Sequence, residues 1–172
     1  MIDSLKIRSL IQEDITQVLE IYNFHINNGY GNFEEEIISI KKFKELSEDI
    51  LKMGLPFLVA EINNQIVGFT YLNKFRKKSG YKFSFENSIY LDNNFSGQGI
   101  GNKLLKRLLE ASEKNSNIKT IIAVISNHNS EASIKIHERN GFNMIGTLKR
   151  VGFKKNKWLD AIYMQKIINE KD

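Results

Sequence analysis

The sequence predicts a mixed α/β fold of the α+β kind, in which antiparallel hairpins are combined with helical crossovers. Two periodicities predict it: apolar residues alternate with a period of two in some segments and recur at helical spacing in others. Asparagine and glycine residues that favour turns separate several of these segments. Read in order, the chain contains a strand, two helices, three strands, a helix, a strand, a helix and two strands. Because hairpins and crossovers are mixed, a doubly wound parallel sheet is not expected.

The first third of the chain is expected to form a short strand and two helices. The strand covers Leu5–Ser9. The first helix is marked by apolar residues at helical spacing, which are Ile15, Val18, Leu19, Tyr22 and Ile26. A second helix is expected at about residues 41–52, because Gly54 follows it and glycine suits the end of a helix.

A hairpin and a longer strand follow. Strands are expected over residues 57–62 and 66–72, with Asn63 and Asn64 in the turn, because asparagine tolerates left-handed backbone. The next strand is expected over Tyr81–Leu91. Its alternation assigns Tyr81, Phe83, Phe85, Ile89 and Leu91 to one face and Lys82, Ser84, Glu86, Ser88 and Tyr90 to the other.

The last part of the chain begins with a glycine-rich turn at residues 96–101, which precedes an amphipathic helix. A short apolar strand is expected over residues 120–125 and a helix over residues 130–140. Residues 142–152 and 158–166 are expected to pair as a final hairpin across a lysine-rich loop.

The bulk properties favour one globular domain over residues 1–172 and exclude several classes of protein. The chain has no cysteine, which excludes disulfides, thiolate metal sites and a cysteine nucleophile. Its start lacks the features of a signal peptide, and no apolar run approaches the ~20 residues of a membrane span, so we expect a cytoplasmic protein without a membrane partner. The net charge of +5 comes from scattered basic residues, so nucleic acid is not expected, and these residues form either solvated loops or a site for an anionic ligand. The separated histidines His25, His128 and His137 do not predict a metal site, and surface or capping roles are expected for His25 and His128.

The glycine-rich turn, Ser96-Gly97-Gln98-Gly99-Ile100-Gly101, is a candidate anion site because it opens a helix. The first N–H groups of a helix lack internal partners, and glycines let a pyrophosphate approach the backbone. A simple tight turn is the alternative. The spacing differs from the G-x-G-x-x-G of dinucleotide-binding folds, and no Gly-Lys-Ser/Thr of a P-loop follows.

Several motifs in the same order resemble the GNAT acetyltransferase superfamily, and within it the phosphinothricin acetyltransferase branch. The turn at residues 96–101 resembles the Q/R-x-x-G-x-G/A turn that binds the coenzyme A pyrophosphate, although Ser96 replaces the usual Gln or Arg. Residues 81–91 resemble the branch's Y-x-x-T-x-E-x-S-V-Y-V strand, and residues 134–142 resemble its S-I-x-L-H-E-x-L-G-F segment. The likeness covers nearly the whole chain.

The resemblance implies a GNAT-like fold with a central, mostly antiparallel, twisted sheet of about six to seven strands flanked by about four helices. It implies transfer of an acetyl group from acetyl-CoA, without a metal, to the amine of a small amino-acid-like acceptor in a ternary complex. Phosphinothricin, methionine sulfone and methionine sulfoximine are acceptors of this type, and a homodimer is implied. A protein N-terminus or a polyamine as acceptor remains an alternative, as does a non-catalytic coenzyme A-binding module.

The resemblance also implies site residues. Glu86 is expected as the catalytic base, against the alternative of a solvent-facing or lysine-paired carboxylate. His137 is expected to protonate the leaving thiolate, against the alternative of a packed helix histidine. Residues expected to bind coenzyme A are Ile89, Tyr90, Leu91, Gly97, Gln98, Gly99, Ile100, Gly101, Asn102 and Asn129. For Asn129, helix capping is an equal alternative, and Ser130 could take its contact. The residues expected at the acceptor are Tyr30, Phe33, Arg76 and Lys78, with core packing (Phe33) or a solvated basic loop (Arg76 and Lys78) as the alternatives.

Overall fold

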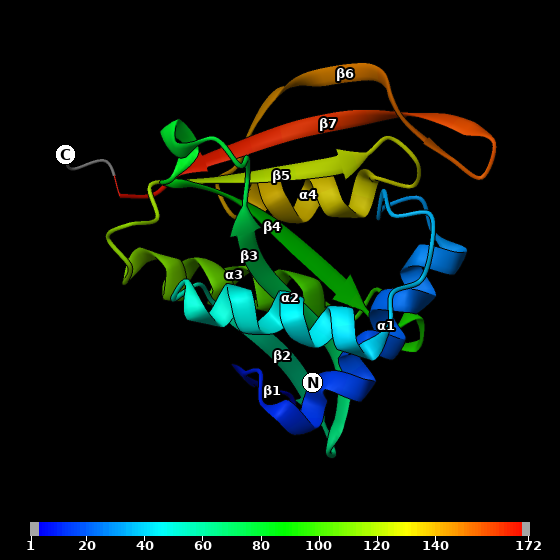
Figure 1. Ribbon diagram of the computed structural model, residues 1–172, viewed down its shortest axis with the longest axis vertical. Helices are drawn as coiled ribbons and strands as arrows, with labels where there is room; N and C mark the ends of the chain where they lie inside the picture. The colour runs from blue at the N-terminus through cyan, green and yellow to red at the C-terminus, as the bar shows by residue number, and fades with distance from the viewer. Residues whose placement is uncertain (1–3, 170–172) are drawn as a thin grey trace.

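A computed structural model describes residues 4–169, which form a seven-stranded sheet with helices on both faces (Figure 1). The strands are β1 (Lys6–Ser9), β2 (Phe57–Ile62), β3 (Gln65–Lys74), β4 (Ser84–Leu91), β5 (Thr120–Ser126), β6 (Asn143–Lys154) and β7 (Lys157–Ile167). The α-helices are α1 (Ile15–Asn28), α2 (Ile40–Lys52), α3 (Ile100–Glu113) and α4 (Glu131–Arg139). Short 3-10 turns lie at Gln12–Asp14, Ser79–Tyr81 and Asn93–Phe95. The single-domain prediction also includes residues 1–3 and 170–172, which lie outside the described part.

The sheet order is β1-β2-β3-β4-β5-β7-β6, and every neighbouring pair is antiparallel except β4 and β5. The predicted order of elements and the mixed α/β class with a mostly antiparallel sheet are therefore confirmed. Helices α1 and α2 pack on one face and α3 and α4 on the other (Figure 1). None of the helices within residues 4–169 is long and apolar enough to cross a lipid bilayer.

The core under α1 and α2 is rich in aromatic residues. Phe43 of α2 is fully buried and packs edge-on against Phe57 of β2 and Phe69 of β3, with ring centroids 6.3 and 6.5 Å apart. Aromatic rings bury large areas and prefer such tilted contacts, so this cluster is a major contributor to stability. It fixes α1 and α2 over the middle of the sheet.

Several expected boundaries differ from the structure. The strand predicted over Tyr81–Leu91 begins only at Ser84, because residues 79–81 form a 3-10 turn. Tyr81 and Phe83 are 44% and 40% exposed, so their place in the alternating pattern does not reflect core packing. The lysine-rich connection of the last hairpin is also shorter than expected, since β6 and β7 are joined by Lys155 and Asn156, both in left-handed conformation.

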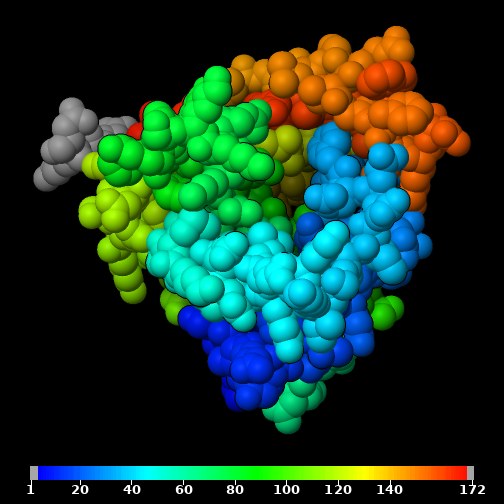
Figure 2. Space-filling model, in the orientation of Figure 1, coloured from blue at the N-terminus to red at the C-terminus, as the bar shows by residue number. Residues whose placement is uncertain are grey.

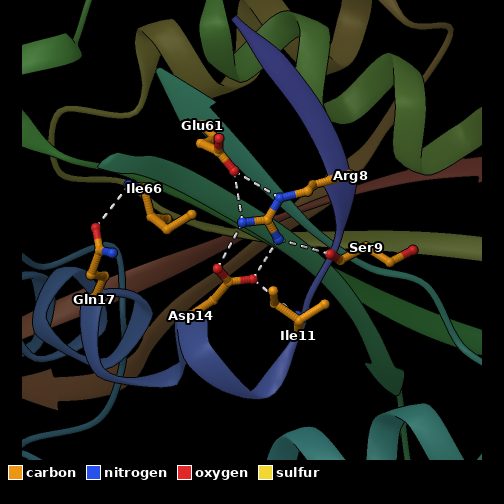
Figure 3. Close-up of polar contacts among 7 residues, drawn as sticks. All are labelled: Arg8, Ser9, Ile11, Asp14, Gln17, Glu61 and Ile66. Carbon is orange, nitrogen blue, oxygen red and sulfur yellow. Dashed lines mark hydrogen bonds and ion pairs between the residues drawn. The ribbon is translucent and has the colours of Figure 1, made fainter. Parts of the chain in front are cut away.

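A partly buried ion-pair cluster fastens the start of α1 to the sheet (Figure 3). Arg8 of β1 lies 2.6 Å from Asp14 Oδ2 and 2.7 Å from Glu61 Oε2. Asp14 Oδ2 also accepts a hydrogen bond of 2.9 Å from the Ile11 N–H. Although burial alone would raise the pKa of Asp14, these hydrogen bonds and the Arg8 charge hold that pKa below its usual value. The cluster matters for function because α1 carries one wall of the site described next.

Candidate active site

The parallel strands β4 and β5 separate partway along their length. Their register runs from Ser84↔Thr120 to Asn87↔Ala123 and then stops, although β4 continues to Leu91 and β5 to Ser126. Within the described part of the chain, residues 88–91 of β4 therefore make no backbone pairing with β5. On that side the backbone N–H and C=O groups of β4 are left for another partner.

A cavity of about 580 Å³ lies at this separation. Its walls come from both faces of the sheet, since Tyr22 and Leu46 belong to α1 and α2 while Ser133 and His137 belong to α4. Figure 2 shows the surface hollowed between the light-blue segment before α2, the cyan α2 and the green β3–β4 connection. After the substrates expected from the sequence, we call the part on the α1 and α2 face of the sheet, with residues 31–34, the acceptor half, and the part lined from α4 and residues 128–130 the donor half. A cavity that passes through a sheet can bring together two molecules that enter from opposite faces.

Glu86 lies in the acceptor half. It is half-buried on β4 opposite Asn73 of β3, and it lines the cavity. Burial raises the pKa of Glu86, and the cation of Arg76 opposes this rise. A carboxyl group with a raised pKa inside a cavity is suited to accept a proton from a bound molecule.

Two tyrosines lie near this carboxylate, Tyr71, which is buried, and Tyr90, which is half-buried. Burial raises the pKa of the Tyr71 hydroxyl and that of the Tyr90 hydroxyl, so both remain protonated at neutral pH. Both residues line the cavity. They supply the acceptor half with neutral hydroxyl groups rather than with charge.

Neither of the two predicted basic residues is among the described residues that line the cavity. Arg76 is exposed, with its guanidinium 4.2 Å from the Phe75 ring centroid, and it donates a hydrogen bond of 3.4 Å to the Tyr163 hydroxyl. Lys78 is exposed at the start of the 3-10 turn and does not line the cavity in the part of the chain described here. Lys74, which the sequence did not single out, does line it.

His137 is held by two hydrogen bonds. It is 3% exposed, its Nδ1 lies 2.7 Å from the Ser133 carbonyl oxygen, and its Nε2 lies 3.0 Å from Asn87 Nδ2. A carbonyl can only accept and an amide nitrogen can only donate, so Nδ1 carries the proton and Nε2 carries none. Burial lowers the pKa of His137, although the Ser133 carbonyl opposes this, and the ring is neutral. This arrangement favours the packed-histidine alternative over an acid.

The glycine-rich turn is exposed and open. Gly97 and Gly99 have φ values of 75° and 78°, a left-handed conformation that disfavours other residues. A Cβ on either would meet no atom within 4 Å, so space is free above the turn. Ile100 is fully buried and anchors the start of α3. The exposed helix start therefore fits a phosphate group.

The side chains next to this helix start are engaged elsewhere. Asn102 Oδ1 accepts a hydrogen bond of 2.8 Å from Asn140 Nδ2, which ties α3 to the end of α4. Gln98 Nε2 donates to the Asn94 carbonyl at 3.3 Å. Contacts with an anion at this turn would come from the main chain.

The remaining predicted residues divide between the two halves. Asn129 lines the donor half with a φ of 54°, while the N-cap of α4 is Ser130, whose side chain makes no capping bond within the described chain. Capping therefore does not account for Asn129. Phe33 lines the acceptor half, whereas Tyr30 packs on His128 with ring centroids 4.4 Å apart and is not itself a lining residue in the described part.

Two histidines expected to have surface or capping roles also line the cavity. His25 Nε2 lies 2.7 Å from the Leu91 carbonyl oxygen, and its ring is 5.5 Å from that of Tyr90. His25 follows Tyr22 by three residues, so its place on the buried stripe of α1 could have predicted its orientation. His128 comes from the loop after β5, where the sequence gives no such signal. Within residues 4–169, no group of three or more potential ligands is placed to hold a metal ion.

Comparison with known proteins assigns the family. Residues 7–163 match the Acetyltransferase (GNAT) domain. The chain belongs to the GNAT acetyltransferase family. The resemblance seen in the sequence motifs is thereby confirmed.

Named relatives of this GNAT chain are acetyltransferases that act on small molecules by their names. It is 32% identical to a phosphinothricin N-acetyltransferase of Alcaligenes faecalis over 96% of this chain and 84% of that protein. It is 28% identical to an L-methionine sulfoximine/L-methionine sulfone acetyltransferase of Salmonella typhimurium over 96% of both chains. A GNAT superfamily phosphinothricin acetyltransferase from Sinorhizobium meliloti, solved in complex with AcCoA, superposes with a TM-score of 0.90 and is 31% identical over 97% of this chain and 90% of that chain.

Proposed function

We propose that this protein transfers the acetyl group of acetyl-CoA to the amino group of a small amino-acid-like acceptor, in a ternary complex. The observation that carries the proposal is the cavity through the split between β4 and β5, with a carboxylate of raised pKa in its acceptor half. The names of the relatives point to acceptors of the phosphinothricin, methionine sulfone and methionine sulfoximine type.

Acetyl transfer from a thioester to an amine needs a base, a partner for the developing oxyanion and fixed positions for both reactants. In the proposed mechanism Glu86 takes the proton of the acceptor ammonium, directly or through a water. The free amine attacks the thioester carbonyl, whose oxygen is stabilised by a backbone N–H among Ile89, Tyr90 and Leu91. The nitrogen then loses its second proton to water, the C–S bond breaks and the thiolate leaves.

Coenzyme A is held in this proposal by the start of α3. Its pyrophosphate would accept hydrogen bonds from main-chain amides in the segment from Gly97 to Asn102, and Asn129 would meet the chain further along. The exposed left-handed glycines and the neighbouring donor half support this arrangement.

The acid role predicted for His137 stays a prediction, and we propose a different one. His137 is a neutral positioning residue that holds Asn87, and the thiolate takes its proton from solvent. The hydrogen bonds of both ring nitrogens support this proposal. On this proposal, His137→Phe retains turnover but raises the KM for acetyl-CoA, and a turnover below about 1% of wild type would restore the acid role.

Arg76 and Lys74 are the proposed cations for the acidic group of the acceptor. Lys74 lines the cavity, and Arg76 lies close enough to Glu86 to lower its pKa. Phe33 would form an apolar wall, and Tyr30 would hold His128 beside the cavity. Lys78 would contribute only long-range electrostatic attraction. These basic groups favour an amino acid over a polyamine, because like charges repel.

We also propose a cytoplasmic homodimer built from single-domain subunits. The edge strand β6 supports a dimer, because its side chains Ile145 and Val151 are 60% and 53% exposed, and Trp158 of β7 is 54% exposed. Monomeric proteins rarely leave large apolar patches uncovered. Light scattering after gel filtration would give twice the subunit mass of 19.9 kDa.

The central experiment measures release of free thiol from acetyl-CoA with a panel of amines. Methionine sulfone, methionine sulfoximine and phosphinothricin should be acetylated, whereas spermidine and a peptide amino terminus should react poorly. Glu86→Gln should lower turnover by about 10²–10⁴-fold while acetyl-CoA still binds. Glu110→Gln on the exposed face of α3 is the matched control. Wild-type turnover by Glu86→Gln, or no thiol release with any amine, would refute the proposal.

A further inference from the structure

One side-chain amide in the acceptor half is buried without a partner. Asn32 is 6% exposed and lines the cavity. Its Oδ1 accepts a hydrogen bond of 2.8 Å from the Glu34 N–H, but its Nδ2 has no hydrogen-bond partner among the described residues. A buried donor without an acceptor is costly, so such groups usually have a function or a missing partner.

The segment around Asn32 is fastened so that this amide cannot easily turn elsewhere. The Asn32 carbonyl accepts a hydrogen bond of 2.7 Å from Lys154 Nζ, and Lys154 is only 1% exposed. The neighbouring Phe33 ring lies directly over Gly152 of β6, since a Cβ there would be 2.3 Å from Phe33 Cε1. The last hairpin therefore holds the backbone at Asn32 and Phe33 in place.

The surroundings of Nδ2 suit an oxygen of a bound molecule. The Tyr22 hydroxyl lies near enough for the Asn32 amide to lower its pKa against the rise caused by burial, but outside hydrogen-bonding geometry. Both groups line the same cavity as Glu86. An oxygen of a molecule bound in this cavity could accept a hydrogen bond from the Asn32 amide, and a donor on a backbone that is already held in place loses little entropy on binding.

We propose that Asn32 is a specificity-determining residue, and that its Nδ2 donates a hydrogen bond to an oxygen of the acceptor, either a carboxylate oxygen or a side-chain oxo group. The inference rests on the proposed acetyl transfer, in which the amine of the same acceptor lies at Glu86. The acceptor is then recognised at two positions. Glu86 meets its amine, and Asn32 selects acceptors that carry an oxygen at the right distance from that amine.

The test compares three acceptors in wild type and in Asn32→Asp. Methionine sulfone carries both oxygen groups, methionine lacks the sulfone oxygens, and 3-(methylsulfonyl)propylamine lacks the carboxylate. Asn32→Asp keeps an oxygen that accepts from the Glu34 N–H. It replaces the donating Nδ2 with a carboxylate oxygen, which cannot donate and has the same negative charge as the substrate's carboxylate. Asn28→Asp, an exposed residue at the end of α1, is the matched control for the added charge.

Asn32→Asp should lower kcat/KM for methionine sulfone at least about tenfold, with the KM for acetyl-CoA unchanged. The loss should be much smaller for the one analogue that lacks the recognised oxygen, which identifies that oxygen. Equal losses on all three acceptors, or none, would overturn the proposal. If Asn32→Asp fails to fold by circular dichroism, Asn32→Ala, which lacks both donor and charge, is measured in the same way.

Failure of the parent proposal is recognised separately. If wild type releases no thiol with any of the three acceptors, acetyl transfer to such acceptors is refuted. The Asn32 inference is then judged by calorimetry with methionine sulfone in the presence of coenzyme A. Tighter binding to wild type than to Asn32→Asp supports it, and equal or absent binding overturns it.

Discussion

The contact between Phe33 and Gly152 makes a sharp prediction about the acceptor wall. In Gly152→Ala the new Cβ would lie 2.3 Å from Phe33 Cε1 and 2.5 Å from Cδ1. Ordinary carbon contacts begin near 3.5 Å, so the ring must move by about 1.2 Å. Phe33 is only half-buried and can move, so we expect a loss of about 1 kcal/mol in unfolding free energy, at the low end for overpacking.

The displaced ring changes the acceptor half and leaves the donor half alone. Because misplacement by about 1 Å can cost up to 10²-fold in rate, kcat/KM for the amine should fall about tenfold or more, while the KM for acetyl-CoA stays constant. Steady-state thiol-release assays with each substrate varied in turn measure both constants. Gly146→Ala on the same strand is the control, since a Cβ there meets nothing within 4 Å. An unchanged amine kcat/KM in Gly152→Ala would refute the assigned wall.

Three further predictions concern other parts of the site and fold. Arg76→Gln removes the cation that lowers the pKa of Glu86, so the acidic limb of the kcat/KM profile should shift to higher pH, and a downward shift would contradict the assignment. Arg8→Met leaves two carboxylates without their partner and should reduce the unfolding free energy by about 2 kcal/mol in urea titrations; a change within 0.5 kcal/mol, the usual range for surface substitutions, would show that the cluster is unimportant. Gly68→Ala would place a Cβ 2.5 Å from Leu91 Cδ2 and 2.9 Å from the Tyr90 carbonyl oxygen, so it should raise the KM for acetyl-CoA. An altered acceptor KM alone would contradict that last expectation.

Much of the fold could be predicted because local patterns agree with the tertiary structure. The stripe of Val18, Tyr22 and Ile26 is buried as its spacing requires, and the asparagines at 63 and 64 adopt the left-handed conformation of the turn. Strand alternation also assigned Glu86 to the same face as Tyr90. Such features depend on residues close together in the chain.

The details that shape the cavity depend on contacts between distant segments. The support of Asn32 by Lys154 joins residues 122 positions apart, and a lysine in a lysine-rich stretch is normally read as solvated. Similarly, the partner of His137 is Asn87, 50 positions away, so the sequence could not decide between an acid and a packed ring. The alternation at Tyr81 and Phe83 predicted too early a start for β4. The neighbouring strands β3 and β5, which lie far away in the sequence, decide where its pairing begins.

The separation of β4 from β5 also has a consequence for the energetics of the free protein. Residues 88 to 91 keep their pairing with β3, but their N–H groups that point toward β5 lack the pairing that Phe85 and Asn87 have, so they should exchange with deuterium faster than those at Phe85 or Asn87. The pantetheine arm of coenzyme A contains two amides of its own, and it can supply the missing hydrogen bonds. A bound co-substrate would thus act as an additional strand in the gap beside β4.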